Sequence, residues 1–249
     1  MKLIINFFLT LLVLALLVSC KQEYTAQKIV DESIGRSRLY ELENSALFFS
    51  FKNSEYIANR INGNFELLKI NQTDSAEIKD ILSNNGFNRF INGVKIELSP
   101  EQQSKYSNSV NSVHYFSVLP LGLNDAAVNK KLLNPVVIKS KPYYKIEVTF
   151  KQERGGEDFE DIFIYWFNKK SFLLEYLAYK YHTNGGGLRF RAIKKEHLIK
   201  GVRLVDYTNY KPNDKQADLY TLDQLYEKGE LSELSEIKLS NISLKKLVK

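Results

Sequence analysis

The strongest constraint on the fold is a series of apolar runs in the second half of the chain, separated by turn-forming residues. The turns contain Gly155-Gly156, Asn168 to Lys170, Asn184 to Gly187 and Lys200-Gly201. The five runs around these turns are Tyr144 to Gln152, Asp161 to Phe167, Phe172 to His182, Leu188 to Lys195 and Val202 to Tyr210. Successive short strands joined by tight turns pair antiparallel, which predicts a β-meander and disfavours parallel βαβ folds.

The rest of the chain repeats this pattern with a few helical segments. Further strands are predicted at Ala46 to Lys52, Glu55 to Asn62, Asn64 to Gln72, Ile78 to Leu82, Val94 to Leu98 and Glu236 to Leu244. Helices are predicted at Ala26 to Leu42 with an interruption at Gly35, between Asn108 and Pro120, and at Thr221 to Lys228 before Gly229. The sequence therefore predicts an α+β, mainly antiparallel β fold. We expect residues 26–249 to form a single domain, with a curled sheet or incomplete barrel and a few covering helices.

The N-terminus follows a different pattern. Lys2 precedes a mostly apolar stretch from Leu3 to Val18, and the run Leu17-Val18-Ser19-Cys20 resembles a bacterial lipoprotein signal. The resemblance implies that residues 1–19 are a signal peptide and that residues 20–25 are a lipidated tether. The Cys20 thiol would carry a diacylglyceryl group and its freed amine a further acyl chain. Two or more acyl chains hold a protein stably at a membrane, at about 0.8 kcal/mol per buried CH₂.

An uncleaved membrane anchor and a chance hydrophobic start are the alternatives to a lipoprotein signal. A spanning helix needs about 20 apolar residues, and this stretch is shorter and stops at Cys20. Cys20 is also the only cysteine, which excludes an internal disulfide and a cysteine metal site. By resemblance to lipoprotein sorting signals, Lys21 in place of an aspartate favours the outer membrane, facing the periplasm.

The formal net charge is +6, and the lysines are scattered along the chain instead of forming a block. Nucleic acid is therefore not an expected partner, and a mildly basic surface is compatible with an anionic membrane. The sequence does not predict an oligomeric state.

Four stretches carry a resemblance to a known family. They are NGFNRFING (85–93), NSVNSVHYFSVLPLGLND (108–125), QERGGEDFEDIFIYWFN (152–168) and YLAYKYHTNGGGLRFR (176–191). Together they resemble a group of uncharacterised Bacteroidota lipoproteins that share a domain of unknown function. The architecture also resembles the LolA/LolB class of lipoprotein carriers and acceptors. This second resemblance implies a half-open barrel with an apolar concave face suited to acyl chains.

The candidate ligand-binding residues share one face of adjacent predicted elements. They are Val113 and Phe116 on the predicted helix, and Phe163, Tyr165, Leu177 and Tyr179 on the predicted strands. The alternative is that these side chains only fill a core. Arg189 and Arg191 flank Phe190, so both guanidinium groups leave the strand on one face. They either face a lipid headgroup at the cavity mouth or pair with Asp206 or Glu175.

No catalytic residue, cofactor or metal site is predicted. The three histidines, His114, His182 and His197, form no His-Glu-x-x-His pair, and Ser112 and Ser117 lie in no G-x-S-x-G elbow. The acidic residues between positions 153 and 161 suit a polar hairpin tip better than a calcium loop.

These observations favour a membrane-anchored envelope lipoprotein that binds an apolar ligand, a lipid or an acyl group. A hydrolase or other enzyme of unknown reaction and a purely structural or interaction lipoprotein are the alternatives. An open cavity would favour the first class, and a completely filled sheet face would favour the structural class.

Overall fold

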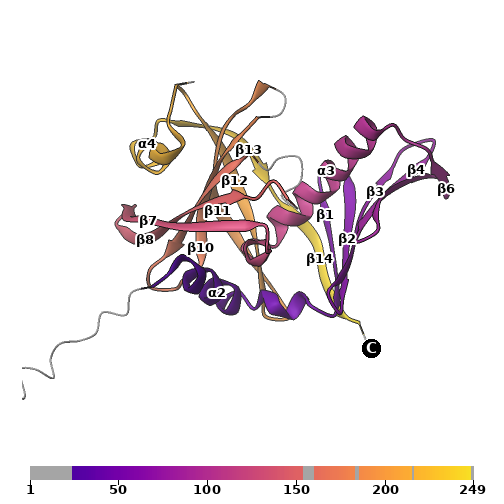
Figure 1. The fold of residues 1–249 in the computed structure, drawn as a ribbon, viewed down its shortest axis with the longest axis horizontal. Coiled ribbons are helices and arrows are strands. Elements are labelled where there is room, and N and C mark those ends of the chain that lie inside the picture. Colours follow the sequence, from indigo (N-terminus) through magenta and orange to yellow (C-terminus); the bar gives the residue numbers. More distant parts are fainter. Residues whose placement is uncertain (1–23, 154–159, 183–184, 215, 248–249) are drawn as a thin grey trace, which may run out of the picture.

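The computed structural model describes residues 24–153, 160–182, 185–214 and 216–247, which form two seven-stranded antiparallel sheets (Figure 1). The strand order of the first sheet is β14 (Leu239–Lys246), β1 (Ser45–Phe51), β2 (Ser54–Ile61), β3 (Asn64–Gln72), β4 (Glu77–Ser83), β5 (Gly86–Ile91) and β6 (Val94–Ile96). The strand order of the second sheet is β13 (Leu231–Ile237), β12 (Val202–Pro212), β11 (Gly187–Ile199), β10 (Leu174–Tyr181), β9 (Ile162–Asn168), β8 (Lys141–Phe150) and β7 (Val128–Ile138).

The two sheets are joined where the chain leaves β13 and enters β14. β13 pairs with β12 and β14 pairs with β1, so the chain changes sheets at Lys238. The backbone N–H of Leu239 donates to the Asp206 carboxylate at 2.8 Å, which fastens this crossing to β12. Neither sheet closes on itself, and the pair forms an open, curled structure.

Three α-helices and three short 3-10 segments are found in the described residues. They are α2 (Ala26–Arg36), η1 (Leu39–Leu42), α3 (Pro100–Ser117), η2 (Leu121–Asn124), η4 (Leu219–Thr221) and α4 (Leu222–Lys228). α3 packs against β3, β4 and β5, and its C-terminal end points toward the second sheet (Figure 1). None of the helices in the described ranges is long and apolar enough to cross a membrane.

The second sheet is buried on both faces along its central strands. Its concave face shares one large core with α2, α3 and the first sheet, including Leu47, Val110, Ile146 and Tyr165. Its opposite face forms a smaller core with α4, including Trp166, Phe190 and Leu222. Burial on both faces explains the nearly continuous apolar sequence of β9, IFIYWFN.

The predicted antiparallel, mainly β architecture with few helices is confirmed. All five predicted runs of the second half are strands, β8 to β12. The final predicted strand, Glu236 to Leu244, is instead divided between β13 and β14 because the chain changes sheets there. The predicted signal, Cys20 and most of the 20–25 tether lie outside the described residues.

The predicted helix boundaries need two corrections. α3 begins at Pro100 instead of Asn108, because Ser99 and Gln102 form a capping box and Pro100 occupies the first turn. Gly35 does not interrupt α2. The helix ends at Arg36 and is capped by Ser37, and Arg38, two residues after the helix end, adopts a left-handed conformation with φ of 53°.

Candidate functional site

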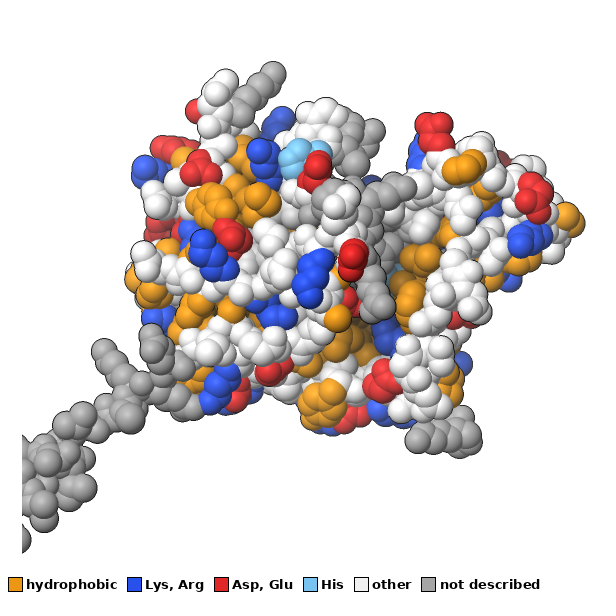
Figure 2. All heavy atoms as spheres, viewed as in Figure 1, with side chains coloured by type: hydrophobic (Ala, Val, Ile, Leu, Met, Phe, Trp, Pro, Cys, Tyr) orange, Lys and Arg blue, Asp and Glu red, His pale blue; other side chains and the backbone are white. Residues whose placement is uncertain are grey.

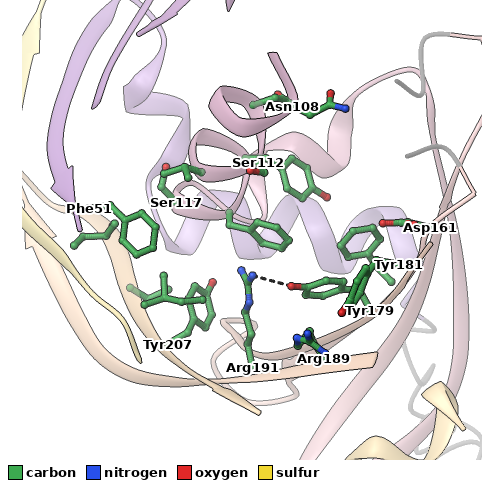
Figure 3. Close-up of a pocket in the computed structure, with 18 of the residues that line it drawn as sticks. Phe51, Asn108, Ser112, Ser117, Asp161, Tyr179, Tyr181, Arg189, Arg191 and Tyr207 are labelled. Atoms are coloured by element: carbon green, nitrogen blue, oxygen red, sulfur yellow. Dashed lines mark hydrogen bonds between the residues drawn. The ribbon is translucent and has the colours of Figure 1, made fainter. Parts of the chain in front are cut away.

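A cavity of about 590 Å³ lies between the C-terminal half of α3 and the concave face of the second sheet (Figure 3). Strands β9, β10, β11 and β12 form one wall, and Phe51, Ile237 and Leu239 line it near the sheet crossing. In the space-filling view, the surface is hollowed between the second sheet and strands β3–β6, with hydrophobic side chains beside the hollow (Figure 2). A volume of this size is typical of small-molecule sites, which span roughly 300–1,000 Å³.

Aromatic rings from α3 and from the sheet meet in the cavity wall. The Phe116 ring lies 5.5 Å from the Tyr179 ring and 6.3 Å from the Phe163 ring, measured between centroids. Phe163 and Tyr179 stack on each other at 5.3 Å. These rings make the wall mainly apolar and fix the distance between helix and sheet.

Six of the eight candidate ligand-binding residues line this cavity. They are Val113, Phe116, Phe163, Tyr179, Arg189 and Arg191. Tyr165 and Leu177 share their face of the sheet but do not line the cavity, since both are fully buried in the core. The Tyr165 hydroxyl meets the Tyr115 hydroxyl at 2.9 Å, so α3 covers this part of the sheet.

Other cavity residues were not identified from the sequence. On α3 they are Asn108, Asn111, Ser112, Tyr115 and Ser117. On the strands and the sheet crossing they include Phe51, Phe150, Asp161, Tyr181, Val205 and Tyr207. The period of two along β12 is the signal that could have placed Tyr207 on the concave face, but the register between β11 and β12 cannot be read from it.

Arg191 is the most unusual residue of the cavity wall. Only 8% of it is exposed, and its guanidinium lies 3.8 Å above the Phe116 ring. Its Nη2 donates to the Tyr179 hydroxyl at 2.9 Å (Figure 3), whereas its Nε is buried and finds no hydrogen-bond partner among the described residues. Burying a charge costs on the order of several kcal/mol. A desolvated cation–π contact returns about 2 kcal/mol and the hydrogen bond to Tyr179 about 1.5–3 kcal/mol, but the Nε donor stays unsatisfied within the described residues.

The predicted carboxylate partners of the arginines are engaged elsewhere. Glu175 accepts a hydrogen bond from the Tyr143 hydroxyl at 2.6 Å, and Asp206 accepts one from the Leu239 backbone. Within the described ranges, neither Arg189 nor Arg191 forms an ion pair with a carboxylate. The interpretation that Asp206 or Glu175 neutralises them is therefore wrong, although Phe190 does lie on the opposite face, as the alternation predicted.

Tyr207 adds a second unsatisfied polar group to the same wall. Only 1% of the residue is exposed, and its hydroxyl has no hydrogen-bond partner among the residues that the structure describes. Burial raises the pKa of Tyr207 to about 12, so the hydroxyl keeps its proton at neutral pH. It can therefore donate a hydrogen bond to a ligand.

The histidines and serines form no nucleophile pair in the described structure. His114 faces the first sheet, where its Nε2 meets the Leu68 carbonyl at 3.0 Å. The Ser117 hydroxyl donates to the His114 carbonyl at 2.8 Å within the helix. His182 and Asp161 interact at 3.2 Å, and Asp161 also lines the cavity. No group of three potential metal ligands occurs in the described ranges.

The chain belongs to a family of unknown function (DUF6503), whose model matches residues 6–239. No curated protein matches the sequence. A solved structure of a DUF1329 family protein from Desulfovibrio piger is similar with a TM-score of 0.51 and 10% identity, covering 88% of this chain and 92% of that one. This likeness shows a shared fold.

Two further solved structures are similar at lower scores. A LolA superfamily protein from Nitrosomonas europaea has a TM-score of 0.48 and 15% identity, covering 88% of this chain and 94% of that one. A putative outer membrane lipoprotein-sorting protein domain from Vibrio parahaemolyticus has a TM-score of 0.45 and 10% identity, covering 90% and 95%.

Proposed function

We propose that this protein is a lipid-anchored envelope lipoprotein that binds an apolar ligand, a lipid or an acyl group, in the cavity beneath α3. The observation that carries the proposal is the open cavity between α3 and the second sheet, walled by Phe116, Phe163 and Tyr179. A sheet face that served only as a core would be filled by side chains to the density of a protein interior. An apolar cavity with a few polar groups is instead the usual form of a small-molecule site.

The cavity is tested by photo-crosslinking of an acyl chain that bears a diazirine. With the full-length protein in nanodiscs, we expect saturable cross-links to peptides from α3 and β9–β12, and unlabelled lipid should compete for them. Cross-links spread over the whole surface, without saturation, would favour the structural-protein alternative.

A tryptophan at Ser112 should block the cavity. Ser112 lies on α3 at the cavity and is exposed, so the larger side chain can be accommodated without disturbing the core. We expect Ser112→Trp to weaken ligand binding by about tenfold or more, which corresponds to about 1.4 kcal/mol. The matched control is Lys105→Trp, an exposed position of the same helix that does not line the cavity. Equal binding by both variants would contradict the proposed location.

The proposed anchor rests on the run Leu17 to Cys20. We expect Cys20→Ala to abolish incorporation of radiolabelled palmitate, because the substitution removes the thiol that would be acylated. The unacylated variant should accumulate as unprocessed precursor. We place the mature protein on the periplasmic face of the outer membrane, so an added protease should digest it only after that membrane is permeabilised. Label in the variant equal to that in the native protein would refute the anchor.

A further inference from the structure

Two unsatisfied hydrogen-bond donors lie side by side in the wall of the cavity. Arg191 is opposite Asn209 in the pairing of β11 with β12, and Tyr207 lies two residues from Asn209 on β12, so both side chains leave the same face. Figure 3 shows both side chains reaching from the strands toward α3. The Arg191 Nε and the Tyr207 hydroxyl are both buried and lack partners in the part of the chain that is described.

The chemistry of this pair suits an anion. A guanidinium can only donate hydrogen bonds, and the protonated Tyr207 hydroxyl donates one more. The contact with Phe116 and the hydrogen bond to Tyr179 hold the guanidinium in one orientation. A fixed arginine with a neighbouring donor matches the oxygens of a carboxylate or a phosphate group.

The opposite end of the cavity carries different groups. Asp161 interacts there with His182. Arg189 is closer to the subsite, two residues from Arg191 on β11, and lies over the Tyr181 ring with its guanidinium carbon 4.9 Å from the centroid. Figure 3 places Asp161 beyond Tyr179, on the side away from Tyr207. Asp161, the one carboxylate among the described residues that line the cavity, therefore lies away from the two unsatisfied donors.

We propose that Arg191 and Tyr207 form an anion-binding subsite, so that the ligand is a single-chain amphiphile with a carboxylate or phosphate head. This inference rests on the proposed function, because it assigns a head group to the ligand of the same cavity. The chain of the amphiphile lies along Phe116, Phe163 and Tyr179. An ester- or amide-linked acyl group has no charge at its head, so the subsite selects a free anionic lipid over the acyl group of a lipoprotein.

The test compares three photoactivatable probes with identical chains and different heads. The heads are a carboxylate, a phosphate monoester and a primary alcohol, and the full-length protein is held in phosphatidylcholine nanodiscs. The readout is the probe concentration that half-saturates cross-linking to peptides from α3 and β9–β12. We expect both anionic probes to saturate at concentrations about tenfold lower than the alcohol.

Variants separate the subsite from the rest of the cavity. Arg191→Gln should remove the preference for the anionic heads while the alcohol still labels the cavity. Arg191→Lys should retain part of the preference, because it keeps the charge. Tyr207→Phe keeps the packing and should reduce the preference even if Arg191→Gln folds poorly. Lys180→Gln removes the same charge from an exposed position of β10 outside the cavity and should change nothing.

The outcomes distinguish the two proposals. Equal saturation by all three probes in the native protein overturns the anion-binding subsite and leaves the apolar cavity standing. Absence of saturable labelling by any probe overturns the proposed function itself. Inorganic phosphate or acetate that displaces an anionic probe as effectively as the unlabelled amphiphile would show a site for small free anions, which overturns the assignment to a lipid.

Discussion

Asp223→Ala is expected to lower the free energy of unfolding by about 3–5 kcal/mol, because it leaves a buried lysine without its counter-ion. The Lys145 ammonium lies 3.0 Å from the Asp223 carboxylate, and only 7% and 3% of the two side chains are exposed. Lys145 also donates to the Tyr220 carbonyl at 2.7 Å and lies 5.3 Å above the Trp166 ring. These contacts cannot replace the lost negative charge. Domains are stable by only about 5–15 kcal/mol, so this loss is a large fraction of the total stability. Urea denaturation of the native protein and the variant measures it.

Two further variants test the reason for this loss. Lys145→Met combined with Asp223→Leu removes both charges and should recover most of the stability, because apolar side chains of similar size can replace a buried ion pair. Glu236→Ala breaks an ion pair with Lys194 in which both side chains are about half exposed, and should cost less than about 1 kcal/mol. If Asp223→Ala also lowers the free energy of unfolding by less than about 1 kcal/mol, the buried pair does not stabilise the contact between α4 and the second sheet.

The strands of the second half could be predicted because their signals are local. Each of β8 to β12 is a run of apolar residues bounded by its own turn chemistry. β7 was missed because its polar Lys130-Lys131 and the Asn134-Pro135 pair argue against a strand. The structure accommodates Pro135 where the register shifts between Leu133 and Val136, on the edge strand of the sheet. The register shift is a property of the pairing between β7 and β8, so the sequence of β7 alone does not predict it.

The cavity was only partly predictable for a related reason. The alternation of Arg189, Phe190 and Arg191 fixes which face each side chain leaves, and the structure follows it. The proximity of Arg191 to Tyr207 depends on the register between β11 and β12, which shifts between Ile193 and Lys195. The distinction between Phe163 in the cavity and Tyr165 in the core depends on where α3 covers the sheet. The register between β11 and β12 and the position of α3 on the sheet are set by tertiary contacts, and the periodicity of apolar residues does not predict them.

The placement of α3 in turn depends on His114. Val110, His114 and Ser117 form the buried side of the helix, whereas Val113 and Phe116 line the cavity. The His114 ring packs edge-on against Phe49 and Tyr56, at 5.6 and 5.4 Å between centroids. Its contact with the Leu68 carbonyl fixes the helix to β3. A change in the charge or packing of His114 should therefore alter the position of α3, which forms one wall of the cavity.

Acid should destabilise the protein through this histidine. Burial lowers the pKa of His114 to about 4 in the folded state, and the nearby positive charge of Arg60 acts in the same direction. The unfolded chain, in which histidine has a pKa of about 6.5, takes up a proton well before the folded protein does. The stabilisation is therefore complete above about pH 6.5 and is lost as the pH falls from there to about 4, by about 3 kcal/mol in total.

The measurement is urea denaturation of the native protein and of His114→Gln at a series of pH values. Glutamine does not titrate, and its amide can still donate to the Leu68 carbonyl. We expect the native protein to lose stability relative to His114→Gln as the pH falls from about 6.5 to 4, and the difference to be constant above that window. NMR of the labelled imidazole should show that His114 stays neutral at pH 5. If the two proteins lose stability in parallel across this window, His114 is not the group that couples acid to the anchoring of α3.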